Sequence, residues 1–431
     1  MPLSDVSERF ALDLDSSRPA PAREQFIPLP ADGGAYPEAA YFAGNSLGLQ
    51  PRTASAALQD MLDAWSGLAV HGHFEGEIPW MQYHQYLNEA SARMVGAGAA
   101  EVTIMNTLTV NLHLLLASFY RPTATRYRIL IEDNAFPSDS YAVRSHTQFR
   151  GFDPDDAVLR IRPRAGEDTL RTEDVIAYLG EHGASIATVL LGAVNYLTGE
   201  FMDMPAITEA GHSVGAFVGW DLAHAAGNVP LELHDWNIDF AAWCTYKYIN
   251  SGPGSIAGAF IHERHLTDPS IPRLEGWWGN RAENRFEMAP ISDMPPTAEA
   301  WVMSNPPILA LAPLRASLEI FDAIGMPTLR ARGLELGDYL LGLLDHVASR
   351  APLQVVTPRD AQHRGNQLSI RINGDVAEFA QRMRYNWGVI PDDRKPDIIR
   401  MAPVPLYTSY HDCWRGADAV SRELTGEGLG Q

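Results

Sequence analysis

Short apolar runs alternate with longer stretches of helical periodicity between about residues 56 and 316. The runs lie at residues 128–131, 185–191, 215–220, 240–245 and 255–261. This alternation is typical of repeated βα units, and it predicts an α/β fold with a mainly parallel sheet. In open sheets of this kind, ligands bind in a crevice outside the carboxyl ends of the strands. The fold class therefore also predicts where a binding site should lie.

Length and composition divide the chain into three segments. At 431 residues the chain exceeds the size that one hydrophobic core usually supports. Residues 1–55 are rich in Pro, Ala and Gly and predict an N-terminal arm, followed by a large domain over residues 56–316. A Pro-rich joint at 305–307 leads to alternating helical and strand-like segments, which predict a smaller α+β domain over residues 317–431.

The charge balance bears on the partners of the chain. Its 33 basic and 53 acidic side chains give a formal net charge of −20, and no Lys/Arg-rich block interrupts this excess of acid. We therefore expect no nucleic-acid and no membrane partner. The first 25 residues lack the apolar stretch of a secretory signal, and no segment reaches the roughly 20 apolar residues of a membrane span. With only two cysteines, the sequence predicts a cytoplasmic protein without disulfides.

Two residues at strand ends indicate a specific cofactor. Asp221 ends one apolar run, and Tyr246 and Lys247 follow another, so both positions should face the same crevice. A lysine amine can form a Schiff base with the aldehyde of pyridoxal phosphate, and a carboxylate can keep the pyridine nitrogen protonated. Taken singly, an Asp at the end of a strand is more often a helix cap, and a lysine beside a Ser/Gly turn is more often a solvated loop residue.

Further polar and aromatic residues lie where a phosphate and a planar ring would need them. Thr109 stands at the start of the helical run 110–119, where hydroxyl and amide groups can bind phosphate. The segment 135–139 (AFPSD) offers Phe136 as an aromatic face, followed by short polar side chains. His224, three residues after Asp221, can act beside that carboxylate. The alternatives are that Thr109 is a plain N-cap, that residues 135–139 form a surface turn, and that His224 is a core histidine.

A catalytic metal is not expected. His71, His73, Asp221 and His224 could supply ligands, but three convergent ligands with an open position are required. The sequence contains no helical HExxH pair that would supply them.

Six separate segments, in order along the chain, resemble the kynureninase family. They are NTLTVNLH (106–113), AFPSD (135–139), WDLAHAAGN (220–228), WCTYK (243–247), SNPPIL (304–309) and RMAPVPLY (400–407). The similarity extends from about residue 41 to residue 412. It implies fold type I of the pyridoxal phosphate enzymes, the aspartate aminotransferase type, in a homodimer with shared active sites. The implied activity is hydrolytic Cβ–Cγ cleavage of L-kynurenine or 3-hydroxykynurenine to an anthranilate and L-alanine.

The resemblance also implies roles for individual residues. Lys247 corresponds to the Schiff-base lysine, and Asp221 to the partner of the pyridine nitrogen. Tyr246 matches a phosphate-side contact, and its position next to Lys247 also suits it to transfer protons. Arg400 matches the arginine that binds the substrate α-carboxylate, which suits a guanidinium fork. The implied cofactor contacts are Leu108, Thr109, Phe136, Ser138, Asp139, Asp221, His224, Tyr246 and Lys247, with Trp277 and Asn305 reaching the phosphate region from the neighbouring subunit.

The resemblance also bears on the ring of the substrate, and the chain differs from the family at one cofactor contact. His73, Ser304 and Asn305 resemble the trio of family members that favour 3-hydroxykynurenine, so we expect a hydroxylated or otherwise substituted ring. A Ser or Thr that contacts the cofactor in the family is replaced by Gly192, which puts that contact in doubt. Asn195 could still approach the cofactor, and the glycine leaves room for a larger substrate ring.

Three alternatives remain open from the sequence. An aminotransferase or a cysteine desulfurase would share the sheet and the lysine, and a non-catalytic relative would use the crevice only for binding. A desulfurase needs an exposed nucleophilic cysteine, which neither Cys244, in a predicted buried strand, nor Cys413 provides. Lys247, Asp221 and Arg400 are all intact, which argues against a non-catalytic relative.

Overall fold

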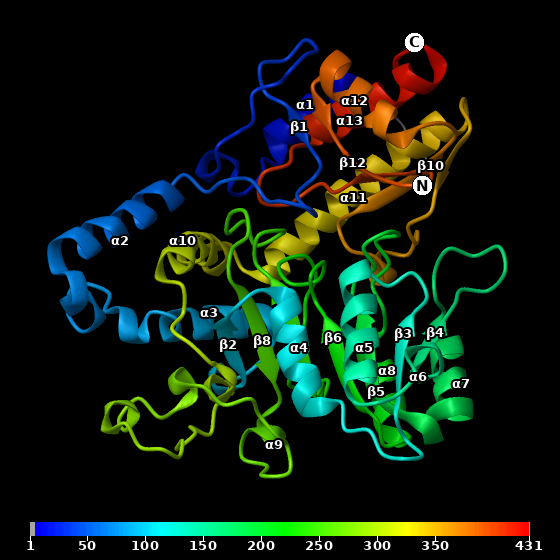
Figure 1. Cartoon of the computed structure of the whole chain (residues 1–431). Coiled ribbons are helices and arrows are strands. Elements are labelled where there is room, and N and C mark those ends of the chain that lie inside the picture. Colours follow the sequence, from blue (N-terminus) through cyan, green and yellow to red (C-terminus); the bar gives the residue numbers. More distant parts are fainter. Residues whose placement is uncertain (1–4, 431) are drawn as a thin grey trace.

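A seven-stranded sheet forms the centre of the larger part of the molecule, in the computed structural model that describes residues 5–430 (Figure 1). The strand order is β2-β8-β7-β6-β5-β3-β4, and only β8 runs antiparallel to its neighbours. The strands are β2 (Val102–Met105), β3 (Arg128–Glu132), β4 (Val158–Ile161), β5 (Ile186–Gly192), β6 (Phe217–Asp221), β7 (Phe240–Cys244) and β8 (Ala257–Ile261). The predicted α/β fold with a mainly parallel sheet is confirmed.

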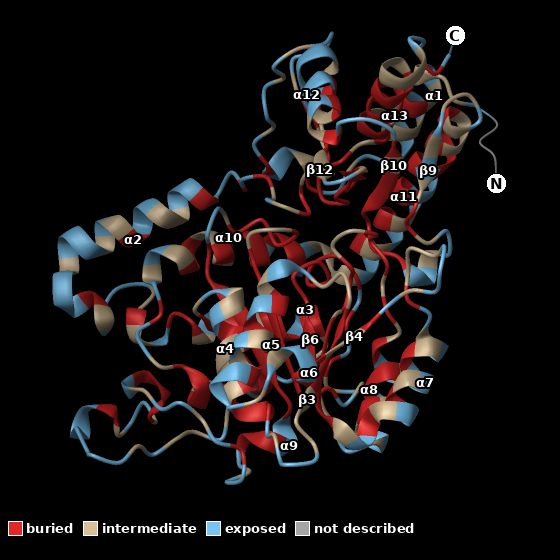
Figure 2. Cartoon of the chain, turned by 45° about the vertical axis from the view of Figure 1, so that its right-hand side comes forward, coloured by how far each residue is buried: buried red, intermediate tan, exposed pale blue. Residues whose placement is uncertain are grey.

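Helices cover both faces of this sheet, which explains why its central strands are apolar throughout. Along β3, Ile129 and Ile131 belong to the core beneath α4 and α5, whereas Leu130 belongs to the core on the opposite face. The helices of this part are α2 (Ala54–Leu68), α3 (Gln85–Val95), α4 (Leu108–Phe119), α5 (Pro137–Phe149), α6 (Pro154–Ala157), α7 (Thr172–His182), α8 (Met204–Ser213), α9 (Glu263–Leu266) and α10 (Ile308–Ile324). Figure 2 shows the sheet as buried and α2 as largely exposed.

A second core lies around a four-stranded antiparallel sheet of order β12-β13-β10-β9. Its strands are β9 (Leu353–Val355), β10 (Leu368–Ile372), β12 (Asp392–Arg394) and β13 (Ile398–Met401), and its helices are α11 (Met326–Ala348), α12 (Val376–Trp387) and α13 (Tyr410–Thr425). The N-terminal segment packs onto this smaller part (Figure 1): α1 (Glu8–Ser17) lies against α13, and β1 (Ala40–Tyr41) pairs with β11 (Val389–Ile390).

The boundary expected between residues 316 and 317 falls inside α10. This helix buries Leu311 and Leu314 before that point and Leu318 and Phe321 after it, all in the core of the larger part. The chain changes direction at Gly325, whose φ of 83° separates α10 from α11. Among the described helices, none combines the length and the apolarity needed to cross a membrane.

Candidate active site

A cavity of about 360 Å³ opens at the carboxyl ends of the central strands, where the fold class predicts a site. Ten of the residues singled out in the sequence line it: Leu108, Thr109, Phe136, Ser138, Asp139, Asp221, His224, Tyr246, Lys247 and Arg400. They come from both parts of the molecule, because Arg400 belongs to β13 and the others to the larger part. Residues more than 100 positions apart in the sequence therefore meet in one hollow.

Lys247 stands in the turn after β7. Its Nζ lies 3.0 Å from His224 Nε2 and 5.7 Å from the centroid of the Phe136 ring. The strand ends at Cys244, and the amide of Asn250 donates to the Lys247 carbonyl to close the turn. Because the backbone has left the strand here, Tyr246 and Lys247 both line the cavity although adjacent strand residues would point to opposite faces.

His224 is buried against the lysine. Burial lowers its pKa well below the usual value, and the positive charge of Lys247 adds to this. The imidazole is therefore neutral and is arranged to accept a hydrogen bond from the Lys247 amine through Nε2. The interaction orients the amine toward the cavity.

Asp221 and Asp139 form a buried acidic pair. Asp221 ends β6, is 6% exposed, and accepts a 2.6 Å hydrogen bond from the Ala223 amide. Burial raises its pKa, while the Ala223 amide and Lys247 oppose this shift. Burial also raises the pKa of Asp139 well above its usual range, and the neighbouring Asp221 charge adds to the shift. Asp139 therefore holds the proton of the pair, and Asp221 carries the negative charge.

The N-terminus of α4 faces the same cavity. Thr107 precedes the helix with extended backbone, and its side chain does not cap it. The first amides of a helix carry partial positive charge and bind anions when no side chain occupies them. Leu108 and Thr109 place these amides, together with the Thr109 hydroxyl, at the cavity wall.

Arg400 supplies a buried cation from the smaller part. Its side chain is 1% exposed; Nη1 donates to the Tyr196 carbonyl at 2.6 Å, and Nη2 to Ser46 Oγ at 3.1 Å and to Asp392. Asp392 also pairs with Arg394 at 2.5 Å. The Arg400 Nε–H finds no partner among the residues that the structure describes. The guanidinium is thus held in place, and its Nε–H is a buried donor without a partner among these residues.

Asn195 does not line this cavity, and four of the site residues that the resemblance implies also lie outside it: His73, Trp277, Ser304 and Asn305. Ser304 and Asn305 are exposed, and Trp277 is 44% exposed. A chain of ring contacts at 5.5 to 6.3 Å runs from His73 through Phe74 and Phe286 to Trp277, and the Met303 carbonyl accepts from the Trp278 amide beside Ser304. The four residues therefore gather in a separate exposed region of the same chain.

Sequence reasoning missed several residues of the site. Asn45, Ser46, Glu132, Tyr196 and Arg394 line the cavity, and Asp392 forms ion pairs with Arg394 and Arg400. Glu132 was missed because the apolar run was taken to end at residue 131, whereas β3 continues to Glu132. Extending the strand by one residue would have placed a carboxyl at the edge of the sheet. The contacts of Asp392 depend on the pairing of β12 with β13, which no local pattern reveals.

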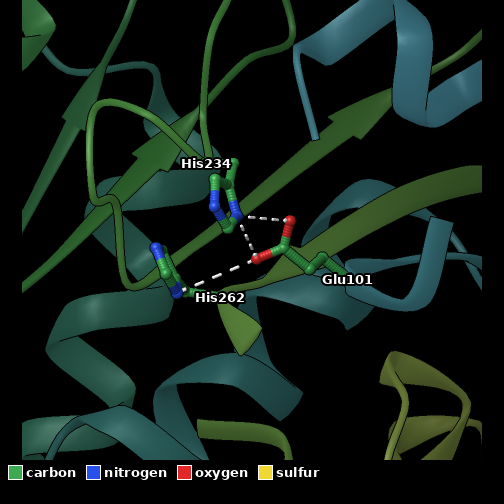
Figure 3. A group of neighbouring side chains, drawn as sticks. All are labelled: Glu101, His234 and His262. Carbon is green, nitrogen blue, oxygen red and sulfur yellow. Dashed lines mark hydrogen bonds and ion pairs between the residues drawn. The ribbon is translucent and has the colours of Figure 1, made fainter. Parts of the chain in front are cut away.

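Glu101, His234 and His262 form a second polar cluster (Figure 3), and none of the three lines the cavity. His234 Nδ1 is 3.0 Å from each Glu101 carboxylate oxygen. These oxygens also accept from the amides of Glu263, at 2.7 Å, and Gly98, at 2.8 Å. His262 Nδ1 accepts from the Arg264 amide at 3.3 Å. These acceptor atoms are already hydrogen-bonded within the protein. The cluster therefore connects the start of β2 to α9.

Comparisons with known proteins agree with this architecture. Residues 329–420 match the family model of the kynureninase C-terminal domain. The chain is 60% identical over 415 residues to a kynureninase from Salinispora tropica and 50% identical over 413 residues to one from Myxococcus xanthus, with 96% of each chain covered in both cases. A solved cysteine desulfurase from Escherichia coli covers 93% of this chain and 97% of its own, with a TM-score of 0.75 and 17% identity. The desulfurase bears on the fold alone.

Proposed function

The chain belongs to the kynureninase family, and from that premise we propose that it is a pyridoxal 5'-phosphate-dependent hydrolase that cleaves the Cβ–Cγ bond of L-kynurenines. The products are an anthranilate and L-alanine. The observation that supports this best is that Asp221 and Lys247, at the ends of the neighbouring strands β6 and β7, meet Arg400 from β13 of the smaller part in one cavity.

The residues present fit this cofactor. Lys247 offers the amine for its aldehyde, and it is one of only two lysines in the chain; the other, Lys395, is exposed between β12 and β13. Asp221 offers a buried carboxylate for the ring nitrogen, and Phe136 an aromatic face. The N-terminus of α4 offers amides for the phosphate. When bound, pyridoxal phosphate supplies an electron sink for the substrate carbanion.

The side chains around the amine have distinct tasks in this proposal. His224 orients Lys247 through the 3.0 Å contact, and the Lys247 amine would carry protons to and from the substrate. Burial raises the pKa of the Tyr246 phenol, which therefore stays protonated and can donate a proton to the substrate. Asp139, which holds the proton it shares with Asp221, leaves the negative charge on Asp221 where the cofactor needs it.

Arg400 binds the substrate α-carboxylate. Its unpartnered Nε–H is a buried donor, and such a donor costs free energy until an acceptor arrives. Asp392, Ser46 and the Tyr196 carbonyl hold the two Nη atoms, so the guanidinium plane is set before the substrate binds. A fixed guanidinium recognises a carboxylate with less loss of side-chain entropy than a mobile one.

We propose a homodimer in which His73, Trp277, Ser304 and Asn305 act in the partner's cavity. In support, they gather away from the cavity of their own chain, in a region with the exposed apolar side chains of Phe74 (60% exposed) and Phe286 (55% exposed), which contact each other beside Trp277. Exposed apolar patches of this kind mark interfaces. We further propose that the protein has no nucleic-acid or membrane partner, which its net charge of −20 supports, and that it is cytoplasmic, which its two free cysteines support.

The substrate ring is proposed to carry a 3-hydroxyl group or another substituent. His73, Ser304 and Asn305 supply hydrogen-bonding groups in that region, and a site built to bind a hydroxyl group discriminates strongly against a ring without one. His73 Nδ1 is buried and finds no partner among the described residues, so it is free to serve a ligand. Comparing kcat/KM for 3-hydroxykynurenine and kynurenine tests this: a clear preference for kynurenine contradicts it.

The cysteine positions disfavour a desulfurase, although that class shares the fold. Cys244 and Cys413 are both buried, and burial raises the pKa of each thiol, so neither is a mobile nucleophile. Product analysis distinguishes the proposed activity from that of an aminotransferase. An aminotransferase would form a keto acid, whereas the proposed hydrolase releases alanine and a fluorescent anthranilate.

Borohydride reduction of the cofactor-loaded protein, followed by peptide mapping, tests the proposed chemistry directly. The reduced adduct is expected on Lys247 and not on Lys395, the only other lysine. An adduct on Lys395 alone, or none at all, excludes the proposal.

A further inference from the structure

Glu132 is a buried carboxyl group of the cavity to which the function proposed above gives no task. It ends β3, is 4% exposed and lines the cavity. Its Oε2 accepts from Asn195 Nδ2 at 2.9 Å, and the Gly192 amide donates to the same carboxyl group. The side chain is therefore held in one position at the cavity wall.

Gly192 provides the space that this carboxyl group occupies. A Cβ atom on residue 192 would lie 3.0 Å from Glu132 Oε1, closer than ordinary van der Waals contact. Gly192 is the last residue of β5 and pairs in register with Asp221 on β6. The absence of a side chain at this position thus brings the Glu132 carboxyl group next to the strand end that carries Asp221.

The groups around Glu132 favour its protonated form. Burial raises the pKa of Glu132 to about 7, opposed by the hydrogen bonds from Asn195 and Gly192, and the charge of Asp221 raises it further. Among the described residues Glu132 forms no ion pair; the titratable groups that sense its charge are Asp139, Tyr196 and Glu200. At neutral pH a large fraction of Glu132 is therefore a neutral acid with a proton to donate.

The order of the strands indicates which part of the cofactor this acid meets. Lys247 follows β7, Asp221 ends β6, Gly192 ends β5 and Glu132 ends β3, in that order across the sheet. The helix α4, proposed to bind the phosphate, packs on β7 and β8 at the other side. In pyridoxal phosphate, the phosphate-bearing carbon and the phenolic carbon lie on opposite sides of the line from the ring nitrogen to the aldehyde carbon. The phenolic oxygen is thus the polar group that should face β5 and β3.

We propose that Glu132 is the hydrogen-bonding partner of the phenolic oxygen of the bound cofactor, and that Gly192 is small so that this carboxyl group can reach it. The inference rests on the proposed function. The proton on Glu132 donates to the phenolic oxygen, and when Glu132 ionises its charge stands beside the ring. Glu132 is in this sense a positioning residue for the cofactor and a source of pH dependence in its absorbance.

The test is a pH titration of the visible absorbance of the holoenzyme, which needs no turnover. A negative charge beside the lysine-bound chromophore stabilises its protonated form, so Glu132→Gln should lower the midpoint of this titration by about one pH unit or more. Glu132→Asp, which keeps the charge but shortens the side chain, should give an intermediate midpoint and serves if the Gln variant does not fold.

Glu200→Gln is the matched control. Glu200 is also buried, and burial raises its pKa to about 8, but it does not line the cavity. Its replacement should leave the midpoint of the visible titration unchanged. Identical midpoints in the wild-type protein and Glu132→Gln overturn this inference alone, whereas the absence of any visible band in the wild-type protein would instead contradict the proposed function.

Discussion

At the carboxyl end of the central sheet, Asp221 and Glu132 are buried without an ion pair to any described residue, whereas at the amino end Asp239 and Glu101 are buried among cationic partners. Asp239 directly precedes β7, and Glu101 directly precedes β2. The same sheet therefore buries carboxyl groups at both ends, in opposite electrostatic surroundings.

Asp239 is a buried carboxylate whose charge is compensated by neighbouring histidine and arginine side chains. It lies 2.8 Å from His212 Nε2, 2.7 Å from His265 Nε2 and 2.5 Å from Arg264 Nη2. Burial by itself would raise the pKa of Asp239, but the hydrogen bonds from the two histidines and the arginine charge hold it far below its usual value. The charged form is the stable one, and it ties α8 and α9 to the sheet.

At the cavity end of the sheet, burial has a larger effect on the carboxyl pKa values than the neighbouring positive charge does. Burial raises the pKa of Glu132, Asp139 and Asp221, and Lys247 is the nearby cation that opposes the shift for the two aspartates. Such an arrangement costs stability in the unliganded protein, and strained or uncompensated groups of this kind concentrate at functional sites. The comparison separates carboxyl groups that hold the fold together from those that await a ligand.

Replacing Lys247 should have the largest effect of these substitutions, and the effect should be on activity and cofactor binding, not on stability. Lys247→Ala is expected to abolish the visible band of the bound cofactor and to reduce turnover by roughly a thousandfold or more, because the covalent link and the proton carrier are both lost. Lys395→Arg, at the other lysine, should leave both unchanged. Absorbance and anthranilate release are the measurements, and wild-type turnover in Lys247→Ala would refute the assignment.

Replacing Asp239 should instead affect stability. Asp239→Asn removes the buried counter-charge of Arg264 and the carboxylate that His212 and His265 contact, which is expected to lower the free energy of unfolding by about 3–5 kcal/mol. Urea unfolding measures this. The exposed pair of Asp345 with Arg359, 2.7 Å apart, is the control, since Asp345→Asn should cost at most about 1 kcal/mol. A loss of the same size in both variants would remove the distinction between the two sheet ends.

The contrast between local and long-range information explains what the sequence could predict. The strand ends that carry Asp221 and Lys247 were predictable because runs such as 217–220 and 240–244 are apolar over their full length, as strands covered on both faces must be. The helix at Thr109 was predictable for the same local reason, although it begins two residues earlier than the run 110–119.

The rest depended on packing between distant segments. Asp392 acquires its role only when β12 pairs with β13 and brings it opposite Arg400, and the N-terminal segment joins the smaller part through the packing of α1 on α13 and the pairing of β1 with β11. Glu132 matters because Gly192, 60 positions later, leaves space for it. No spacing rule in a single sequence connects such positions.

Glu200 sharpens the comparison, because it is buried without an ion pair to any residue between 5 and 430 and does not line the cavity. Burial raises its pKa to about 8 from the usual 4.5. The stability tied to its neutral form is thus complete below about pH 4.5 and declines as the pH rises toward 8. This one group should lower the free energy of unfolding by about 2–3 kcal/mol between pH 5 and pH 7.

Glu200→Gln should therefore flatten the decline of stability with pH. Denaturant unfolding at several pH values gives the slope, and Glu209→Gln, a substitution on the exposed side of α8, is the control. An unchanged slope in Glu200→Gln would show that this carboxyl group ionises freely, and burial alone would then not explain the raised pKa values at the cavity end.

The smallest effect is expected from His234, at the compensated end. The hydrogen bond with Glu101 raises the pKa of His234 above 6.5, so its stabilisation is complete below that pH and is lost as the pH rises through the higher, folded-state value. Because the side chain is 39% exposed, solvent screens the pair, and His234→Gln should cost only about 0.2–1 kcal/mol at pH 5.5 and less at pH 8.5. Melting temperatures at the two pH values, in low and in high salt, measure this. A loss that grows at pH 8.5 would mean that Glu101 is stabilised mainly by the amides of Gly98 and Glu263, and that the cationic partner adds nothing at this corner of the sheet.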